Sequence, residues 1–431
     1  NARFITCEAE GEVFFKMAAG ADGRILWLGD DLPAEYASMP RIDLGGAVAV
    51  PAFGDTHMHF ESFSTFENTF NISDAHSFDE AAVRTYAEAH PREKLLIGFG
   101  ACGHLVREGR LPNREDLDRW AARPLIIVKY DGHAAVCNSA MMSFFSSKVT
   151  DDPGFHADGW LYQSAFYNGV NEVTAKLSPL SIVGGLSKGA AALPAAGIGL
   201  VHAVEGVGYP RDMDVDMLRM LEGGLPQTFR IFFQTMDVSK VLKRRMKRIG
   251  GCFELALDGC FGSEDAALLA PYTNNPDNRG VLNYTQEQVN AFAIAANRAG
   301  LQITMHAIGD AAVEQCITAY EAALADLPRP DHRHIMIHCC MVSPSQLDRI
   351  AALGLCLAVQ APFIDWAQEP DRSLREILGD RADGLNPLRS MWDRGIVIAD
   401  GSDAPCTRPD PIRGMHLAGN PPNPPQRLTP Y

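Results

Sequence analysis

The feature that most constrains this 431-residue chain is an alternation of short apolar runs with helical segments from about residue 250 onward. The runs read CFELALDG, LQITMHAIG, HIMIHCC, LCLAVQAPF and GIVIADGSD. Strands that alternate with helices favour a parallel sheet covered by helices. Counting back from the last run places strands at 50–57, 199–205, 229–235, 252–258, 302–307, 335–339, 355–360 and 396–401. We therefore predict an α/β fold, a TIM-type (β/α)8 barrel.

The segments between the runs carry helix signals. Thr285 and Gln288 have the spacing of a capping box, and Gly300 ends the segment that follows. Ser343, Pro344 and Gln346 open another segment, which Gly354 closes.

Two regions lie outside the eight predicted strands. Residues 1–50 contain short extended runs separated by Gly and Asp turns, which indicates a small β module apart from the barrel of residues 51–431. The runs LLIGFG and LIIVKY lie between the first and second barrel strands. We interpret residues 62–190 as a large insertion, which would cover the face where barrel enzymes hold their active sites.

Composition and charge limit the kinds of molecule that this protein is expected to bind. The net charge of −15 is scattered, which argues against nucleic acid or an acidic membrane face, and we find no apolar run long enough to span a membrane. Cysteines lie inside apolar runs without a C-x-x-C pair, as reduced thiols do. With no visible signal peptide, we expect a cytoplasmic protein. A homodimer is the commonest assembly, although no residue indicates one.

Metal-binding residue types gather at the predicted strand ends. His57 and His59 end the first strand and point to one face. The other members are Glu254 in the fourth strand, His306 and His338 at the ends of the fifth and sixth, and Asp403 after the eighth. Such a set suits one or two Zn²⁺ ions with room for a water molecule.

The chain resembles the amidohydrolase superfamily, and within it the YtcJ-type metal-dependent hydrolases of the third family. The resemblance rests on DLGGAVAVPAFGDTHMHF, EGRLPNREDLDRW, DGHAAVCNSAMM, LALDGCFGS, GLQITMHAIGDAAVEQ, LDRIAALGLCLAVQ and GSDAPCTRPDPIRGM. It implies that the four histidines are metal ligands and that Asp403 is both a ligand and the proton-transfer group. It also implies that residues 1–50 begin a β-sandwich module whose C-terminal half is missing from this chain.

The chain departs from these relatives at two strands. Glu254 stands where they commonly carry a lysine open to carboxylation, so it is either a bridging ligand or a structural acid, with Lys129 as the fallback. Ile337 replaces a usual glutamate before His338, and we expect it to face away from the metal.

These residues predict hydrolysis of a non-peptide, amide-type C–N bond in a small molecule by a metal-activated water. Asp403 would serve as general base and then as general acid. We expect His133 and Gln360 to contact the substrate, while His104, His202 and Glu205 are weaker candidates, and we expect Asp310 to cap a helix or orient a ligand. Two alternatives stay open, namely a mononuclear zinc deaminase of an aminated heterocycle and an inactive barrel that acts as a binding protein.

Overall fold

The computed structural model describes residues 2–78 and 81–429. Contacts divide the chain into two compact units, with the boundary between Phe53 and Gly54. The regions predicted at 1–50, 62–190 and 51–431 include residues 1, 79–80 and 430–431, which lie outside the described residues. Among the described helices, none combines the length and apolar character that crossing a lipid bilayer requires.

The N-terminal unit consists of short strands. Strands β1 (Ala2–Ile5), β2 (Val13–Phe14) and β5 (Ala47–Ala49) form one sheet, and β3 (Lys16–Ala19) pairs antiparallel with β4 (Ile25–Gly29). A 3₁₀ turn, η1 (Ala34–Tyr36), follows β4. Several large apolar side chains of this unit are exposed, among them Phe15, Ile25, Leu26 and Ile42.

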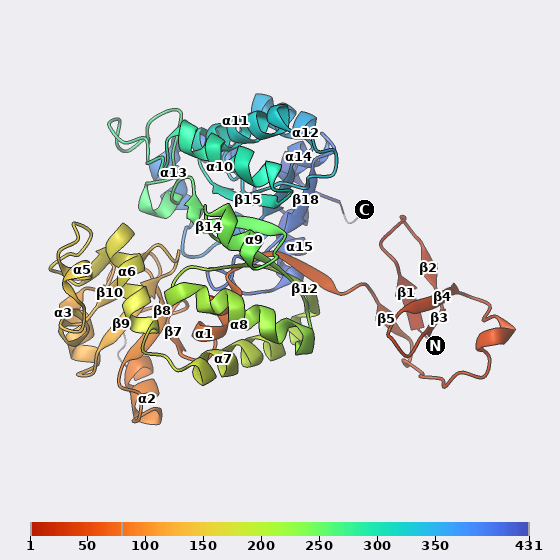
Figure 1. The fold of residues 1–431 in the computed structure, drawn as a ribbon, viewed down its shortest axis with the longest axis horizontal. Helices are drawn as coiled ribbons and strands as arrows, with labels where there is room; N and C mark the ends of the chain where they lie inside the picture. Colours follow the sequence, from red (N-terminus) through yellow and green to blue (C-terminus); the bar gives the residue numbers. More distant parts are fainter. Residues whose placement is uncertain (1, 79–80, 430–431) are drawn as a thin grey trace. The chain divides into compact units, whose positions relative to one another are not determined.

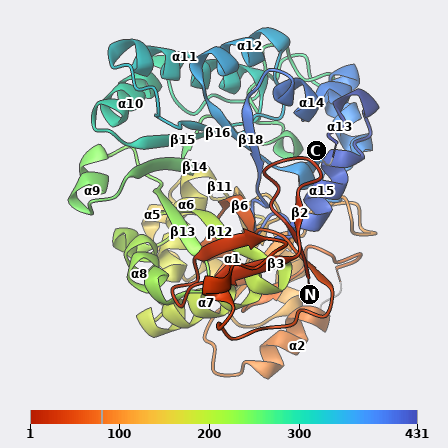
Figure 2. The same ribbon diagram turned by 90° about the vertical axis from the view of Figure 1, so that its right-hand side faces the viewer.

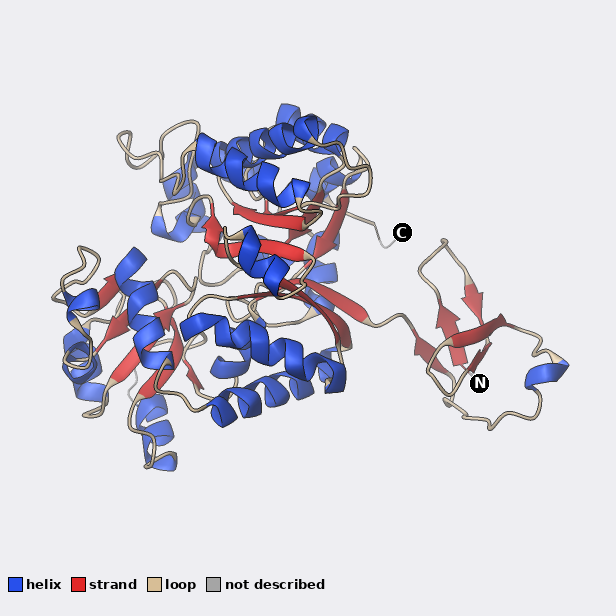
Figure 3. Ribbon diagram, in the orientation of Figure 1, coloured by secondary structure: helices blue, strands red, loops and turns tan. Residues whose placement is uncertain are grey.

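The second unit is built on the predicted barrel, an eight-stranded sheet in the order β18-β17-β16-β15-β14-β13-β12-β6. Its strands are β6 (Phe53–Met58), β12 (Ile198–Glu205), β13 (Thr228–Phe233), β14 (Arg248–Ala256), β15 (Gln302–Ala307), β16 (Ile335–His338), β17 (Cys356–Val359) and β18 (Val397–Asp400). They lie inside a layer of helices (Figure 3). Thr56 Oγ1 donates to the carbonyls of Ala399 at 3.1 Å and Asp400 at 2.8 Å, so the first and last strands also meet. The barrel is therefore nearly closed, and the predicted fold class is confirmed.

The helices begin where the sequence predicted. Both capping boxes form, at Thr285 before α10 (Gln286–Arg298) and at Ser343 before α12 (Pro344–Leu353), and Gly354 ends α12 in left-handed conformation. These helices lie beside α11 (Asp310–Asp326) on the outside of β15 and β16 (Figure 2). The remaining helices of the barrel chain are α1 (Phe60–Phe66), α7 (Pro179–Ala192), α8 (Met213–Leu221), α9 (Val238–Lys243), α13 (Asp371–Leu378), α14 (Leu388–Trp392) and α15 (Pro411–Gly419).

The insertion after β6 forms a second sheet of its own (Figure 1). Its strands run in the order β11-β10-β9-β8-β7, with β7 (Phe70–Asn71), β8 (Leu96–Ala101), β9 (Leu125–Lys129), β10 (Ala134–Cys137) and β11 (Trp160–Tyr162). The helices around it are α2 (Ala81–Ala89), α3 (Arg114–Trp120), α4 (Ser139–Met142), α5 (Ser147–Thr150) and α6 (Gln163–Thr174).

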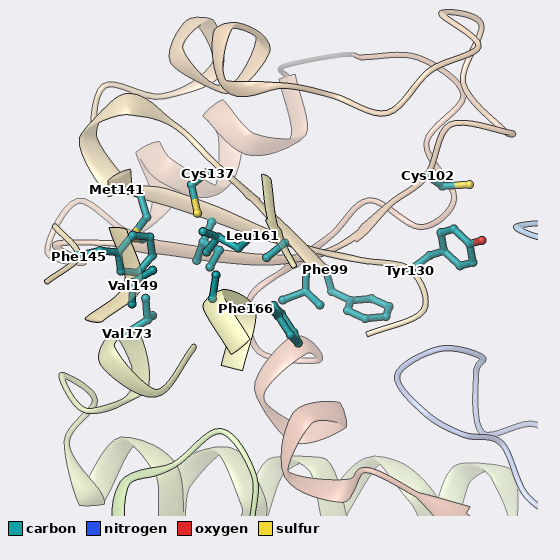
Figure 4. Packing of buried hydrophobic residues seen from close by; sticks show 14 of the residues in the cluster. Phe99, Cys102, Tyr130, Cys137, Met141, Phe145, Val149, Leu161, Phe166 and Val173 are labelled. Atoms are coloured by element: carbon teal, nitrogen blue, oxygen red, sulfur yellow. The ribbon is translucent and has the colours of Figure 1, made fainter. Parts of the chain in front are cut away.

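Alternate residues of the insertion strands belong to two different apolar clusters, because successive side chains of a strand point to opposite faces of the sheet. Leu125 and Ile127 of β9 pack on one face with Trp120 of α3. Ile126 and Val128 pack on the other face, in a cluster that also contains Phe99, Tyr130, Met141 and Phe166. Figure 4 shows this second cluster as a row of side chains, with Tyr130 near one end and Met141 near the other.

Candidate metal centre

The predicted histidines and Asp403 all reach one rim of the barrel. His57 lies in β6 and His59 just after it, His306 lies in β15, His338 is the last residue of β16, and Asp403 follows β18. All five side chains are buried. The carboxyl ends of parallel strands meet at one rim, which explains how residues so far apart in sequence come together.

Distances confirm that these side chains form one cluster. Asp403 Oδ1 lies 2.9 Å from His57 Nε2 and 3.3 Å from His59 Nε2. The ring of His338 lies 5.5 Å from that of His57 and 4.6 Å from that of His306, measured between centroids. The sequence prediction that one strand face carries both His57 and His59 therefore holds.

Left-handed backbone turns two of these side chains into the cluster. His338 has φ 70° and Asp403 has φ 53°, a conformation that is uncommon outside glycine and recurs at functional sites. Beside them, a side chain at Gly401 would approach His57 N to 2.6 Å, so only glycine lets β18 come so close to β6.

The imidazole of His338 is held by a neighbouring side chain. His338 Nδ1 donates to Gln360 Oε1 at 2.6 Å, and Gln360 Nε2 donates to the carbonyl of Ala358 at 3.1 Å. This fixes the tautomer of His338 and leaves its Nε2 lone pair for the cluster. Gln360 was predicted to contact substrate; the structure corrects this, because its amide oxygen is used by His338 and the side chain is buried.

Asp258 lies close to the other ring nitrogen of His306, without the hydrogen-bond geometry that Gln360 has. Its Oδ1 lies 3.2 Å from His306 Nδ1. The same carboxylate accepts hydrogen bonds from the backbone N–H groups of Ile308 at 3.0 Å, Gly309 at 2.8 Å and Ala267 at 3.0 Å. Asp258 was not predicted as a site residue, although the Asp-Gly pair that follows the fourth strand was the available signal.

Burial favours the neutral form of three of the imidazoles. Burial lowers the pKa of His59, lowers that of His306 to about 3, and lowers that of His338 well below its usual value. Burial opposes ionisation of Asp403 too, but the neighbouring imidazole of His57, and after it that of His59, hold its pKa well below the ordinary range. Neutral imidazoles at His59, His306 and His338 beside an ionised Asp403 are in the protonation states that metal coordination requires.

Cys252 of β14 joins the cluster where Glu254 was predicted. Its Sγ lies 3.1 Å from His57 Nε2 and 3.6 Å from His338 Nε2. Glu254 is half-buried, and its Oε1 instead accepts a hydrogen bond from Met236 N at 3.3 Å. The prediction that Glu254 lies with the imidazoles is therefore corrected in favour of Cys252, two residues earlier on the same strand.

Gln234, just after β13, explains this change. Its Oε1 accepts from Cys252 N at 2.9 Å and from Phe253 N at 3.0 Å. The pairing of β14 with β15 also shifts register between Gly251 and Ala256. A strand interrupted in this way no longer alternates regularly, so a side chain's place cannot be read from its position in sequence.

Two fallback interpretations also change. Lys129 Nζ donates to Asp131 Oδ2 and to Ser263 Oγ, both at 2.6 Å, so this lysine is a buried ion-pair partner outside the cluster. Ile337 was expected to face away from the metal. It belongs instead to an apolar cluster with Val204 and Cys252 that only strand residues of the barrel form, which places it in the barrel interior.

The weaker candidates lie elsewhere. Asp310 Oδ1 accepts from Leu269 N at 2.8 Å and does not cap α11, whose N-cap is Gly309. His104 Nδ1 lies 3.4 Å from Ser373 Oγ, and Glu205 accepts a hydrogen bond from Glu61 N at 3.1 Å. His202 lies in β12. None of these four is among the described residues that line the cavity at the centre.

The donor set fits a borderline-soft divalent cation. Two groups bring their ligand atoms within 4.8 Å of one another, His57 with His59 and Cys252, and His57 with His338 and Asp403. Three buried atoms of the cluster, His59 Nδ1, His306 Nδ1 and Asp403 Oδ1, lack a partner in hydrogen-bond geometry among the described residues. Imidazole nitrogen, thiol sulfur and carboxylate oxygen are the ligands of zinc in proteins.

A cavity of about 100 Å³ opens at this cluster. His59, His306, His338 and Asp403 lie at one part of its lining. His133 lines it as well, with its ring centroid 6.1 Å from that of His306. The backbone N–H of His133 donates to Asp131 Oδ1 at 3.2 Å. The cavity is thus shared by the cluster and the insertion, which makes His133 available to a ligand bound there.

Comparison with known proteins agrees with this geometry. Residues 41–419 match the model of the amidohydrolase family. The chain is 25% identical over 401 residues to the putative amidohydrolase YtcJ of Bacillus subtilis, covering 88% of this chain and 74% of that one. It is 23% identical over 445 residues to an N-substituted formamide deformylase of Arthrobacter pascens, covering 92% and 78%.

Among solved structures, an uncharacterized metal-dependent hydrolase from Pyrococcus furiosus matches with a TM-score of 0.78 at 23% identity, over 100% of this chain and 90% of that one. The fold is therefore shared. The protein belongs to the amidohydrolase family and is a hydrolase acting on carbon–nitrogen bonds. The predicted family is confirmed, and the inactive barrel is set aside.

Proposed function

We propose that this protein is a metal-dependent hydrolase that cleaves a non-peptide, amide-type C–N bond of a small molecule, with Asp403 as the proton-transfer group. The observation that carries the proposal is the position of Asp403 Oδ1, 2.9 Å from His57 Nε2 and 3.3 Å from His59 Nε2 at the edge of a cavity. A carboxylate so placed lies beside both the predicted ligands and any substrate in the cavity.

A cation of the Zn²⁺ class would be held by His57, His59, His306, His338 and Asp403, with Cys252 as a sixth donor in place of Glu254. Such an ion supplies Lewis acidity, which lowers the pKa of water to about 7 and polarises a carbonyl group. Gln360 and Asp258 orient the ligand imidazoles from behind, as second partners of metal-bound histidines commonly do.

Asp403 is suited to both proton transfers of amide hydrolysis. Its pKa lies below the ordinary range, so it enters the reaction ionised and accepts a proton from the attacking water. The same carboxylate then returns that proton to the leaving nitrogen, which departs as a neutral amine. His133, half-buried in the lining beside His306, is our candidate for contact with the substrate carbonyl or nitrogen.

The surroundings of His306 favour amide hydrolysis over deamination of a heterocycle. The deaminase alternative needs a glutamate two or three residues after the fifth-strand histidine. Ile308 and Gly309 stand at those places, and Ile308 packs in an apolar cluster with Phe261 and Cys340.

Metal content and turnover test the proposal together. We expect purified protein to contain stoichiometric divalent metal, to lose hydrolysis of N-formyl, N-acyl or cyclic amides on chelation, and to regain it with Zn²⁺. Elemental analysis measures the metal content, and release of amine measures the hydrolysis. Ammonia release from aminated heterocycles without any acid product would contradict the proposal, as would full activity in metal-free protein.

A further inference from the structure

One wall of the cavity is a face of the insertion sheet. Ile97 and Phe99 of β8 and Ile126 and Val128 of β9 all line it, and they belong to or pack against the same apolar cluster. Their spacing of two residues along each strand is the reason that they share one face. This wall is therefore a continuous apolar surface.

A second wall is one side of α6 and its C-terminal extension. Phe166, Val170, Val173 and Leu177 line the cavity. They recur at intervals of three and four residues, which places them on one stripe of a helix. The helix thus turns its apolar side to the insertion sheet, with the cavity between.

Away from the metal centre, the cavity offers no cation to an anionic ligand. Among its described lining residues there is no lysine or arginine, and the carboxylates are Glu61 and Asp131 beside Asp403. Both are already engaged, since Glu61 accepts from Tyr209 and from Thr65 Oγ1 and Asp131 accepts from Lys129 Nζ. A carboxylate or phosphate on the ligand would enter without a counter-charge and would be costly to bury.

We propose that the substrate is a neutral amide that carries a sizeable alkyl or aryl group, and that this group lies between the insertion sheet and α6. The proposal rests on the proposed function for the reacting end of the molecule only. It excludes N-acyl amino acids and other substrates whose second group is anionic.

Two homologous substrate series test it on the wild-type zinc-loaded protein. Butanamide, hexanamide and octanamide extend the acyl side, and N-butyl-, N-hexyl- and N-octylformamide extend the amine side. We expect kcat/KM to rise roughly two- to fourfold per added CH₂ group in the series whose group enters the cavity. The twin of the best octyl compound with a terminal carboxylate, 8-amino-8-oxooctanoate or 8-formamidooctanoate, should be about 100-fold poorer.

Substitutions at Val170 tie the effect to this cavity. Val170→Trp should fill the space and abolish the gain in kcat/KM from chain length. Val170→Lys should improve turnover of the carboxylate twin about tenfold, a gain that misfolding could not produce. Val281→Trp and Val281→Lys are the controls, because Val281 is exposed and does not line the cavity.

Calorimetric binding of the same compounds separates the two proposals. If no amide is hydrolysed but affinity rises with chain length and falls with the carboxylate, the proposed function fails and the apolar site stands. If amides are hydrolysed with no dependence on chain length in either series, or the carboxylate twin is preferred, the apolar site is overturned and the proposed function stands.

Discussion

The two parts of the cavity are built in different ways. At the metal centre, single residues arrive from the ends of separate strands, and each has its own partner, as His338 has Gln360. At the apolar walls, β8, β9 and α6 each present one apolar face to the cavity, and every side chain of a face makes the same kind of nonpolar contact. We therefore expect chemistry at the first part to depend on individual atoms and selectivity at the second to depend on the apolar surface as a whole.

The largest expected effect is at the metal centre. Asp403→Asn keeps the shape of the side chain but removes the proton acceptor, so kcat should fall about 10²- to 10⁴-fold on every amide. Steady-state kinetics measures this, with Asp348→Asn, an exposed aspartate paired with Arg394, as the control. An Asp403→Asn enzyme within tenfold of the wild type would show that proton transfer does not depend on this residue.

Cys252 comes next, because it decides whether the centre includes sulfur. With Co²⁺ in place of zinc, we expect a near-ultraviolet charge-transfer band from a thiolate ligand, and Cys252→Ser should abolish that band. Absorption spectroscopy of the loaded protein measures it, and Cys137→Ser, a buried cysteine of the insertion sheet, should leave it unchanged. A band that survives in Cys252→Ser would exclude sulfur ligation by this residue.

Gln360 tests whether the metal centre depends on residues behind the ligands, since we expect it to act by orienting His338. Gln360→Ala leaves His338 without its acceptor, and we expect a 10- to 100-fold loss of metal affinity. Competition with a metallochromic indicator measures this, and Gln360→Glu, which retains an acceptor, should recover most of the loss. Unchanged affinity in Gln360→Ala would mean that His338 needs no orientation.

Asp131 tests the scaffold at the cavity wall. Burial raises its pKa, but the charge of Lys129, then that of His133, outweighs this and lowers it to about 2. The folded-state pKa lies below the unfolded one, so the pair stabilises the fold above about pH 4 and loses this effect as the pH falls through 2.

Asp131→Asn should therefore cost about 2 kcal/mol of unfolding free energy at pH 6 and about half of that at pH 3. Urea titration of metal-free protein at both values measures it. Asp365→Asn, which breaks an exposed pair with Arg413, should change stability by less than about 0.5 kcal/mol. An Asp131 effect equal at both pH values would contradict this assignment.

The smallest effect should come from Glu254. Its carboxylate bonds to Met236 N outside the cluster, so Glu254→Gln should keep the metal content of the wild type and lower kcat by less than about threefold. Elemental analysis beside Cys252→Ser measures the difference. Loss of one metal ion per chain in Glu254→Gln would restore it as a ligand.

The sequence by itself determined the barrel, its helix caps and the gathering of His57, His59, His306, His338 and Asp403. Periodicity, capping boxes and strand-end positions are local signals, and a closed parallel sheet must bring its carboxyl ends together. A single residue such as Gln360 has no sequence pattern that shows whether it binds a histidine of the centre or the substrate.

Only the tertiary structure decided which residue of β14 faces the centre. Gln234, just after the neighbouring strand β13, accepts hydrogen bonds from two backbone N–H groups of β14. This interrupts the regular alternation of side chains along β14. As a result, Cys252 lies by His57, while Glu254 accepts a hydrogen bond from Met236 N. The apolar walls of the cavity could not be predicted from the sequence either, because β8, β9 and α6 line one cavity only once the insertion packs over the barrel's rim. Both depend on contacts between segments distant in sequence, which no local pattern encodes.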